Sequence, residues 1–488
     1  MKKGSFALMP YYGLKSYSYK GSLVDLFEAF KDDNLPFFLH SGLKSNELGR
    51  FSFLGGSPFL VFKSKGRNLQ IQQNGSLKKK IGNPLAAIKE LLNQYRLNES
   101  IDAIPFLGGA VGYFAYDLGF ILEKIPLRSQ DDLNLPDCIL GFYDPVIIYD
   151  HKMEKLHIFS SGLPEKNTSL AKKLAQYKLK LIEEKLNRWE SGVFKNGASG
   201  WQARLIEPSG YASNFSHESY LKAIVKAKDY IKKGDIYQLN LSQRFSLNNP
   251  GEPFSLYKNL VRINPSPFSA YFDAADFQII SSSPERFLNL NSGVVETRPM
   301  KGTRPRGRDA REDSALRKEL LESAKDKAEL IMIADLERND LGKVCSYGSI
   351  KVKKLRNLES YATVFQTTSS ITGHLHPDKD AIDLLKACFP GGSITGCPKI
   401  RAMQIIEELE PTRRSVYTGA VGYIGFNGNM DLNIAIRTII KKHDEVYFQV
   451  GGGIVADSVP ELEYEETLVK ARALFKALSF VNEPVGVF

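Results

Sequence analysis

Short segments that alternate apolar and polar residues, broken by glycine and proline, recur along this chain. They include FFLHSG, GRFSFLGG and DPVIIYD before residue 165, and DIYQLNLSQRF, FSAYFDA, FQIISSS, YTGAVGYIGF, LNIAIRTII and VYFQVGGG after residue 234. A period of two places alternate side chains on opposite faces of a strand, which suits a sheet with one buried face. Because these strands do not alternate regularly with helices, the pattern favours a mixed α/β (α+β) fold with extended antiparallel sheets over a doubly wound one.

Other segments have the apolar period of amphipathic helices. We expect helices over residues 167–190, 220–231, 313–341 and 400–409, and from about residue 460 onward. Gly234 is placed to end the second helix, because glycine readily adopts the left-handed conformation just past a helix. The glycine- and serine-rich segment 189–210 has no periodicity. It is our candidate linker or hairpin between an N-terminal domain at 1–205 and a second domain at 206–488.

Charge and cysteine content narrow the class of protein. Lys and Arg exceed Asp and Glu by 65 − 55 = 10, a surplus that attracts anions but is spread over 488 residues. The four cysteines form no CxxC pair, which favours a reducing cytosol, and the apolar run after the N-terminal lysines is too short for a signal peptide. No stretch approaches the ~18 uncharged apolar residues of a membrane helix. We therefore expect a cytoplasmic protein without a membrane span.

Two pairs of carboxylates stand three residues apart in segments with helical spacing. They are Asp326 with Glu329, and Glu463 with Glu466. Residues three apart share one face of a helix, so each pair would offer the hard oxygen ligands that Mg²⁺ prefers. Ser458 and Glu461, with Pro460 in the first turn, predict a capping box at the start of the second helix. On spacing alone, such pairs more often mark solvated helix faces, and both interpretations stay open.

A lysine stands in the basic, glycine-rich segment TRPMKGTRPRG. Lys301 is followed by Gly302 and Thr303, a short turn that can present backbone N–H groups to an anion. An amine must be neutral to act as a nucleophile, so nearby cations or desolvation would have to lower its pKa. A solvent-facing run of charge is the alternative interpretation.

Arg437 lies inside the apolar strand segment LNIAIRTII. A cation in such a strand needs a fixed anionic partner, which is either an Asp or Glu side chain or a ligand. Two glycine segments, FPGGSITGCPK and GGGIVADS, can cradle carboxylates with backbone donors. Neither fits the Walker A pattern, so a nucleotide site is not supported.

Taken together and in order, these segments resemble the chorismate-utilising enzymes. The resemblance covers about residues 216–478 and rests on GDIYQLNLSQRF, SSSPERF, TRPMKGTRPRG, DLERNDLG, FPGGSITGCPKIRAMQIIEELEP, YTGAVGYIGF, GGGIVADS and EYEET. FFLHSG, GRFSF and GGAVGYFAYD match the family more weakly in the N-terminal third. The resemblance implies large antiparallel sheets packed as a β-sandwich with surrounding helices, as in the large subunit of anthranilate synthase. It makes residues 206–488 the chorismate-binding catalytic domain.

Roles of family residues carry over where the motifs match. The resemblance implies a Mg²⁺ site with ligands at Glu329 and Glu466, and with Asp326 and Glu463 as second members of the same acidic faces. It places chorismate against Gly302, Thr303, Tyr417, Arg437, Gly451, Gly452 and Gly453. Chorismate has two carboxylates, so one can meet the metal and the other can meet an arginine and backbone donors.

Two positions bear on the branch of the family. Anthranilate synthases have alanine where this chain has Lys301, whereas aminodeoxychorismate synthases typically have a lysine that acts as a covalent nucleophile. Isochorismate and salicylate synthases place a water-activating lysine at the position of Gln238. The sequence therefore favours the aminodeoxychorismate synthase component I branch, with anthranilate synthase component I as the alternative. Many relatives have histidine at the position of Gln366, and glutamine cannot transfer protons.

The favoured branch implies a mechanism and a partner. Lys301 would attack ring carbon 2 of chorismate, with Glu285 in SSSPERF as general acid for the leaving hydroxyl. The alternative interpretation of Glu285 is a strand-end residue that is exposed or whose charge is compensated by Arg286. Ammonia would then give 4-amino-4-deoxychorismate, the precursor of p-aminobenzoate in folate synthesis. No cysteine stands in a glutaminase motif, so the resemblance implies a heterodimer with a glutamine amidotransferase subunit that supplies ammonia.

The family's N-terminal domain contains a tryptophan pocket. The matching positions here are Ser41, Leu48, Gly49, Arg50, Phe51, Pro267, Phe268 and Ser269. LHSG stands in place of the acidic-serine motif that makes the pocket feedback-sensitive. The resemblance therefore leaves tryptophan binding and regulation open.

A non-catalytic protein that binds anions or nucleic acid is the alternative from another class. Against it, aromatic and basic residues do not interleave in a stacking stripe, and no groove-reading helix is evident. We therefore expect neither nucleic acid nor a membrane as a partner. Magnesium-dependent consumption of chorismate would distinguish the enzyme from the binding protein.

Overall fold

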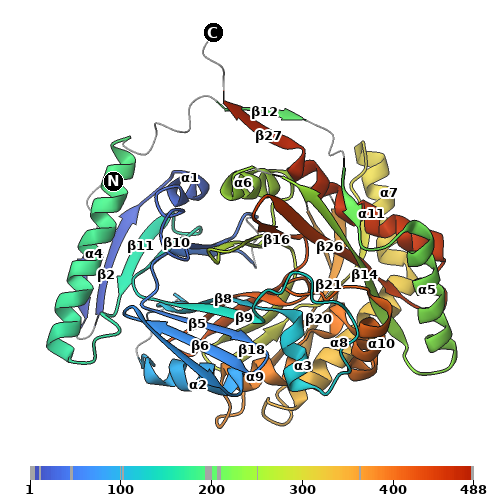
Figure 1. The fold of residues 1–488 in the computed structure, drawn as a ribbon, viewed down its shortest axis with the longest axis horizontal. Helices are drawn as coiled ribbons and strands as arrows, with labels where there is room; N and C mark the ends of the chain where they lie inside the picture. The colour runs from blue at the N-terminus through green and yellow to red at the C-terminus, as the bar shows by residue number, and fades with distance from the viewer. Residues whose placement is uncertain are drawn as a thin grey trace.

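The computed structural model describes residues 6–9, 12–43, 48–98, 101, 104–192, 201–205, 210–249, 251–361 and 364–484 of the 488. Two large sheets face each other in it, and most helices cover their outer faces (Figure 1). Every pair of strands within these residues is antiparallel apart from single-residue bridges. The predicted mixed α/β fold with packed antiparallel sheets is confirmed.

Thirteen of the described strands form the first sheet. Their order is β1 (Phe6–Met9), β2 (Tyr12–Ser18), β11 (Lys155–Ser160), β10 (Val146–Asp150), β4 (Phe51–Gly55), β3 (Phe37–His40), β15 (Phe268–Asp273), β16 (Gln278–Ser283), β25 (Thr438–Lys442), β26 (Glu445–Ile454), β14 (Gln238–Asn248) and β13 (Ala212–Ser213), and β22 (Gly396–Cys397) also pairs with β14.

Twelve described strands form the second sheet. Their order is β19 (Met300–Pro305), β21 (Val364–His374), β18 (Val294–Thr297), β17 (Arg286–Asn291), β24 (Met430–Ile434), β23 (Ala420–Gly425), β8 (Gly109–Phe114), β9 (Cys138–Tyr143), β5 (Leu60–Lys65), β6 (Asn68–Gln73) and β7 (Ser76–Ile81), and β20 (Lys351–Ser360) also pairs with β21.

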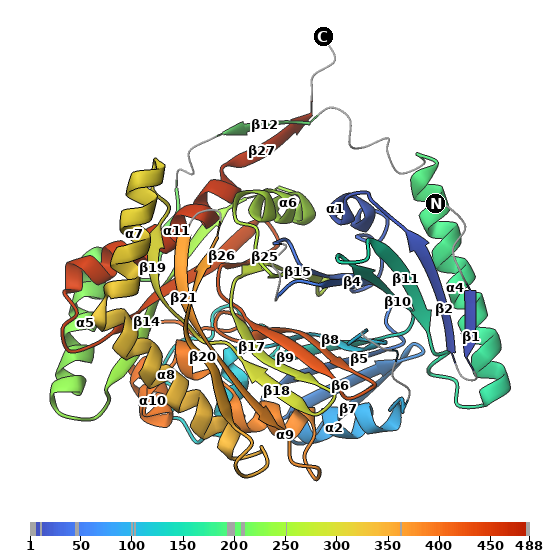
Figure 2. The ribbon, with the colours of Figure 1, turned by 180° about the vertical axis from the view of Figure 1, so that it is seen from behind.

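The helices in the described part of the chain are mostly amphipathic and surround the two sheets. They are α1 (Leu23–Phe27), α2 (Pro84–Gln94), α3 (Gly119–Leu122), α4 (Thr168–Glu190), α5 (His217–Lys232), α6 (Pro253–Ile263), α7 (Ala310–Glu322), α8 (Ala324–Gly342), α9 (Ala381–Cys388), α10 (Lys399–Leu409) and α11 (Pro460–Leu478), with the 3-10 turns η1 (Tyr116–Leu118) and η3 (Gly392–Ile394). Figure 2 shows α7 and α8 beside β19, β20 and β21. None of these helices is long and apolar enough to cross a membrane.

The core consists of layers because both faces of the central strands are buried. On β15, Ala270 and Phe272 join the core between the sheets, whereas Tyr271 faces the helices outside. β8 repeats this alternation with Val111 and Tyr113 between the sheets. The amino-acid sequences of strands buried on both faces are almost continuously apolar. The glycine-rich segment 105–119 brings backbones close together, since a Cβ at Gly112 would lie 2.0 Å from the carbonyl oxygen of Ile139.

Both sheets contain strands from both sides of residue 205. In the first sheet β3 pairs with β15, and in the second β8 pairs with β23. The two parts of the chain, 1–205 and 206–488, thus share one sandwich of sheets. Their division into two domains stays a prediction. Residues 193–200 and 206–209 of the predicted linker lie outside the described residues, and β12 (Trp201–Leu205) between them pairs with β27 (Phe480–Pro484).

Helix boundaries follow the sequence pattern with one correction. The helical structure predicted over 313–341 is confirmed, and it is divided into two helices because Ser323 ends α7 and its hydroxyl accepts the N–H of Asp326 as the cap of α8. The predicted capping box of α11 is wrong. Val459 precedes the helix, and the Ser458 hydroxyl donates to Glu463 instead.

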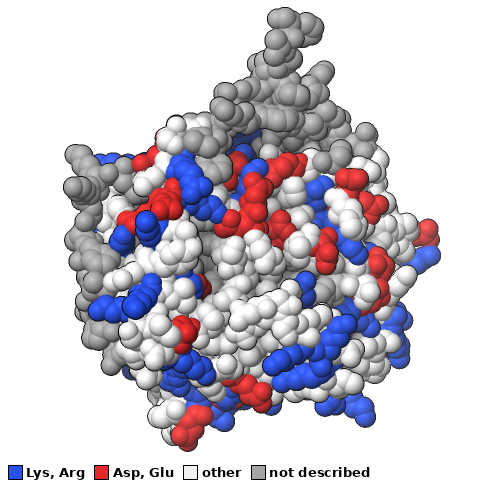
Figure 3. All heavy atoms as spheres, turned by 60° about the vertical axis from the view of Figure 1, so that its left-hand side comes forward, with Lys and Arg blue, Asp and Glu red and all other residues white. Residues whose placement is uncertain are grey.

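Acidic and basic side chains gather in small separate groups on the face in Figure 3, among a broad neutral surface. The net charge of +10 does not concentrate into one field of a single sign on this face. A long basic stripe, as on many nucleic-acid-binding surfaces, is therefore not a feature of that side of the molecule.

Candidate active site

Lys301 lies on β19, at the end of the second sheet that contacts α7 and α8 (Figure 2). It is half-buried, and the Thr367 hydroxyl on β21 donates to its carbonyl oxygen at 2.5 Å. The ladder shifts register between Lys301 and Thr303, where Gly302 has a φ of +73°. A Cβ at Gly302 would lie 3.0 Å from Cγ of Asp326, so only glycine lets this bulge lie against α8.

Glu285 occupies the turn between β16 and β17 and is 5% exposed. The Ser393 hydroxyl donates to its Oε1 at 2.6 Å. Burial raises the pKa of Glu285 to about 7, against the opposing effects of the Ser393 hydrogen bond and of the Lys301 charge. The adjacent Arg286 is paired with Asp431 and Glu296, so it does not compensate Glu285. A carboxyl in this state can donate or accept a proton near neutral pH.

The Lys301 charge acts on a second carboxylate as well. Lys470 chiefly, with Lys301 and Lys325 contributing, holds the pKa of Glu466 below its usual value despite burial. Lys301 makes no ion pair with any residue in the described part of the chain. The lysine therefore stands within electrostatic reach of two carboxylates with opposite pKa shifts, Glu285 in the β16–β17 turn and Glu466 on α11.

The four predicted metal-site carboxylates come from α8 and α11, and three of them, Glu329, Glu463 and Glu466, lie beside the glycines at the end of β26. A Cβ on Gly453 would lie 2.8 Å from Oε1 of Glu329, and a Cβ on Gly452 would lie 3.4 Å from Oε2 of Glu463 and 3.8 Å from Oε1 of Glu466. Any other residue at positions 452 and 453 would place its side chain against these carboxylates, so the glycines keep the space beside them open.

The carboxylates differ in their partners. Asp326 pairs with Arg304 at 3.2 Å, and Glu463 accepts the Ser458 hydroxyl at 2.7 Å. Burial raises the pKa of Glu463. Glu329 accepts the side-chain amide of Gln238 at 2.9 Å, and Glu466 pairs with Lys470 at 2.7 Å.

This donor set fits Mg²⁺ better than a metal that needs a full protein cage. The described residues contain no group of three or more His, Cys, Asp or Glu side chains arranged to hold a metal. Mg²⁺ is commonly bound by one or two carboxylates, with waters and an anionic substrate completing its shell. Glu329 and Glu466, from separate helices beside the three glycines of β26, match that requirement.

Arg437 and Tyr417 offer groups for an anionic ligand. The Arg437 guanidinium donates to Oδ1 of Asn264 at 3.3 Å and forms no ion pair with a described Asp or Glu. Burial lowers its pKa. The sequence left two partners open for Arg437, an acidic side chain or a ligand. Among the described residues, no acidic side chain pairs with it. Tyr417 is buried, and burial raises its pKa, so its hydroxyl stays protonated.

Two buried polar atoms near these residues lack a hydrogen-bond partner among the described residues. They are Oε1 of Gln238 and Oε1 of Gln366. The other amide atom of Gln366 donates to the Thr303 hydroxyl at 3.3 Å. Buried polar atoms without partners are costly, so they indicate that a polar ligand or water completes the site.

Comparison with known proteins decides the family. Residues 57–476 match the sequence model of the chorismate binding enzymes. The chain is 41% identical over 464 residues to anthranilate synthase component 1 of Acetivibrio thermocellus, covering 94% of this chain and 93% of that protein. It is 38% identical over 448 residues to aminodeoxychorismate synthase component 1 of Bacillus subtilis, covering 92% and 93%.

The chain belongs to the chorismate-binding enzyme family.

The structure agrees with this assignment. Anthranilate synthase component I from Streptococcus pneumoniae TIGR4 superposes with a TM-score of 0.73 at 34% sequence identity, over 89% of this chain and 93% of that one. Anthranilate and aminodeoxychorismate synthases resemble this chorismate-binding enzyme to a similar degree, so overall similarity does not separate the two activities.

A separate cavity of about 370 Å³ lies between the sheets of this chorismate-binding enzyme. Of the positions matched to a tryptophan pocket, those that line it are Ser41, Gly49, Arg50, Phe51, Pro267, Phe268 and Ser269. Leu48 is buried nearby but does not line the cavity. Arg286 also lines it, on the opposite side of the chain from its neighbour Glu285.

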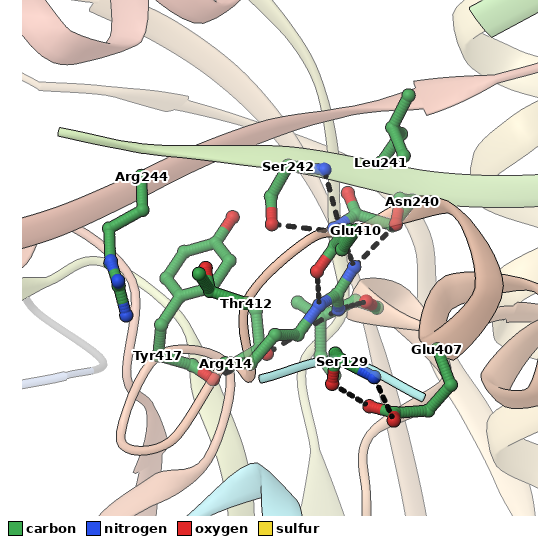
Figure 4. A network of polar contacts seen from close by, with 12 residues as sticks. Ser129, Asn240, Leu241, Ser242, Arg244, Glu407, Glu410, Thr412, Arg414 and Tyr417 are labelled. Atoms are coloured by element: carbon green, nitrogen blue, oxygen red, sulfur yellow. Dashed lines mark hydrogen bonds and ion pairs between the residues drawn. The ribbon is translucent and has the colours of Figure 1, made fainter. Parts of the chain in front are cut away.

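Sequence reasoning missed the residues that hold the site together. Arg414, 2% exposed, pairs with Glu410 at 2.7 Å and donates to the carbonyl oxygen of Asn240 at 2.6 Å (Figure 4). Glu410 also accepts the hydroxyl and N–H of Ser242. This network joins α10 to β14 and begins the turn that ends at Tyr417. The sequence shows that Glu410 and Arg414 are four residues apart and oppositely charged, but it does not show that the pair is buried.

Proposed function

We propose that this enzyme is the chorismate-aminating subunit of an aminodeoxychorismate synthase. It would convert chorismate and ammonia to 4-amino-4-deoxychorismate. The observation that carries the proposal is the position of Lys301, whose charge acts on both Glu285 and Glu466. A lysine so placed is suited to attack a substrate held between them.

Lys301, as the neutral amine, attacks ring carbon 2 of chorismate. The two ring double bonds shift, and the bond from carbon 4 to its hydroxyl breaks. Hydroxide is a poor leaving group, so Glu285 donates its proton and water departs. The pKa of about 7 lets Glu285 hold that proton near neutral pH.

Ammonia then attacks carbon 4, the double bonds shift back, and the bond between carbon 2 and Lys301 breaks. The ionised Glu285 accepts a proton from the new ammonium group, which restores the acid for the next turnover. Overall, chorismate and ammonia give 4-amino-4-deoxychorismate and water. The enolpyruvyl group stays on the ring, and the product suits p-aminobenzoate and folate synthesis.

Glu329 and Glu466 are the side chains that would hold Mg²⁺, which when bound supplies positive charge for the ring carboxylate and withdraws electron density from the ring. Arg437 binds the second carboxylate, together with backbone donors at Gly302 and along the 451–453 glycines. Tyr417 and Thr303 contribute neutral hydroxyls to the same anionic ligand.

We propose further that a glutamine amidotransferase subunit delivers the ammonia and forms a heterodimer with this chain. The four cysteines are all free, at Cys138, Cys345, Cys388 and Cys397, which suits a cytoplasmic enzyme. Burial raises the pKa of each, so none has the activated thiol of a glutaminase nucleophile.

Mass spectrometry tests the covalent step directly. Incubation with chorismate and Mg²⁺ but no ammonia should add a substrate-derived mass to a peptide that contains Lys301, and Lys301→Ala should abolish the adduct. Lys353→Ala, an exposed lysine on β20, is the matched control. A Lys301→Ala enzyme that formed product at the full rate would refute the proposal.

Anthranilate synthase component I is the second candidate, because a relative of that name is as similar to this chain as the aminodeoxychorismate synthase is. Product analysis with ammonium as the nitrogen source separates the two activities. Fluorescent anthranilate with free pyruvate supports the alternative, and a product that retains the enolpyruvyl group supports the proposal.

A further inference from the structure

Glu337 is a second buried carboxyl close to Glu285, and the mechanism above makes no use of it. It lies on α8, a little over two turns beyond Glu329, and is 2% exposed. Its Oε1 accepts the backbone N–H of Gly392 at 3.1 Å. Its Oε2 is buried and has no hydrogen-bond partner among the described residues.

The turn at η3 connects this carboxyl to the candidate general acid. Gly392 is bonded to Glu337, and the next residue, Ser393, donates its hydroxyl to Glu285 at 2.6 Å. A Cβ on Gly392 would lie 2.6 Å from Cδ2 of Leu336 and 3.2 Å from Oε1 of Glu337. The turn therefore lies directly on α8, and glycine is needed for that approach.

Charged and titratable groups face Glu337 from each element packed around it. They are Asp340 on α8, Lys399 on α10, Cys388 on α9 and Glu285 in the β16–β17 turn. Asp340 is itself neutralised by Lys343 and Lys399. Burial first, then Asp340 and, more weakly, Glu285 raise the pKa of Glu337 to about 7, against the opposing effects of Lys399 and of the Gly392 N–H. Two buried carboxyls that act on each other lose their protons in coupled steps.

We propose that Glu337 is a positioning residue for Glu285. It holds the Gly392–Ser393 turn whose hydroxyl orients the acid, and its negative charge favours the protonated form of Glu285. The second role rests on the proposed function, in that Glu285 must act as an acid. Glu337 itself does not touch the substrate.

Glu337→Gln tests the charge while it preserves the shape, because the amide oxygen still accepts the Gly392 N–H. Loss of the negative charge lowers the pKa of Glu285, so the acid form disappears at lower pH. The alkaline limb of the kcat–pH profile should move down by about 0.5 pH unit or more. A purely structural role would reduce stability without moving this limb.

Ser393→Ala tests the other half of the link. The Ser393 hydrogen bond lowers the pKa of Glu285, so its removal should move the same limb upward, opposite to Glu337→Gln. We also expect kcat to fall about tenfold with a smaller change in KM, because an unoriented acid affects chemistry more than binding. Opposite shifts from two residues joined by one turn are not expected from nonspecific damage.

Glu407→Gln is the matched control, since Glu407 is another buried glutamate but holds Ser129 on a different loop. It should leave the limb in place. The rate is followed as ammonium-dependent chorismate consumption, so an anthranilate product would refute the proposed function and leave this inference standing. An unshifted limb in Glu337→Gln overturns the inference. If that variant does not fold, the absence of an upward shift in Ser393→Ala overturns it.

Discussion

The side-chain amide of Gln238 donates a hydrogen bond to Oε1 of Glu329, with 2.9 Å between the two atoms. Gln238 begins β14 and Glu329 lies on α8, so this bond ties the first sheet to the helix that carries the candidate metal ligands. It is the kind of outer contact that orients a ligating carboxylate.

Gln238→Leu should therefore raise the Mg²⁺ concentration that half-saturates activity by ~10- to 100-fold. The measurements are chorismate consumption against Mg²⁺ concentration and Mg²⁺ binding by calorimetry. Gln70→Leu, at an exposed position of β6, should leave both unchanged. An unaltered Mg²⁺ requirement in Gln238→Leu would contradict the role of Glu329 as a Mg²⁺ ligand that Gln238 orients.

Arg437→Ala should raise KM for chorismate by ~10-fold or more, because a hydrogen bond to a charged group contributes about 1.5–3 kcal/mol. Arg437→Lys should recover only part of the loss, since lysine cannot offer a bidentate contact. Steady-state kinetics give KM and kcat separately. Arg308→Ala, at a side chain that is 92% exposed, is the control. Equal KM values for Arg437→Ala and the parent enzyme would contradict a role in substrate binding.

Asp117 makes stability depend on pH. Burial, with Asp137 contributing, raises its pKa to about 7 from 3.8. The folded state therefore keeps its proton while the unfolded state loses it, and the contribution of Asp117 declines as pH rises from about 4 to 7. Relative to the parent protein, Asp117→Asn should gain about 1.4 kcal/mol of unfolding free energy per pH unit in this window.

Urea denaturation at several pH values measures this difference. Asp335→Asn, at a side chain that is 76% exposed, should show no such dependence. A difference between Asp117→Asn and the parent that is constant across the window would mean that Asp117 ionises normally when folded.

Arg414→Ala should lower the free energy of unfolding by about 3–5 kcal/mol, because it leaves Glu410 buried without its cation. The double variant Arg414→Ala/Glu410→Ala should lose less than the sum of the single variants, since no lone charge remains. Urea denaturation of the four proteins completes the cycle. Additive losses would show that the pair in Figure 4 does not act as a unit.

The cavity between the sheets should bind L-tryptophan. It has a volume within the usual range for small ligands, and Phe51, Phe53 and Phe268 offer aromatic contacts beside the polar Ser41. Thermal unfolding should shift upward with tryptophan concentration, as linkage requires. Ser269→Leu should reduce the shift by filling the cavity. No shift at millimolar tryptophan would assign the cavity a purely structural role.

The periodicity of the chain predicted its elements but not all of their ends. The helices at 167–190 and from residue 460 matched α4 and α11, because an apolar stripe spans α4 and a proline in the first turn marks the start of α11. The break at Ser323 was missed, since one serine that caps the next helix does not interrupt the 3.6-residue period. The Ser458 capping box failed for a related reason. The Ser458 hydroxyl donates a hydrogen bond to Glu463, and residue spacing cannot distinguish this contact from a helix cap.

The sequence by itself determined the antiparallel fold, the family and the residue types available for chemistry, because these depend on local periodicity and on motif order. Only the tertiary structure decided which of those residues lie together. Lys301, Glu285 and Glu466 are far apart in the chain, and their mutual electrostatic effects exist because β19, the β16–β17 turn and α11 converge. The burial that brings Glu285 and Glu337 to a pKa of about 7 is likewise a property of packing between elements, on which a linear pattern carries no information.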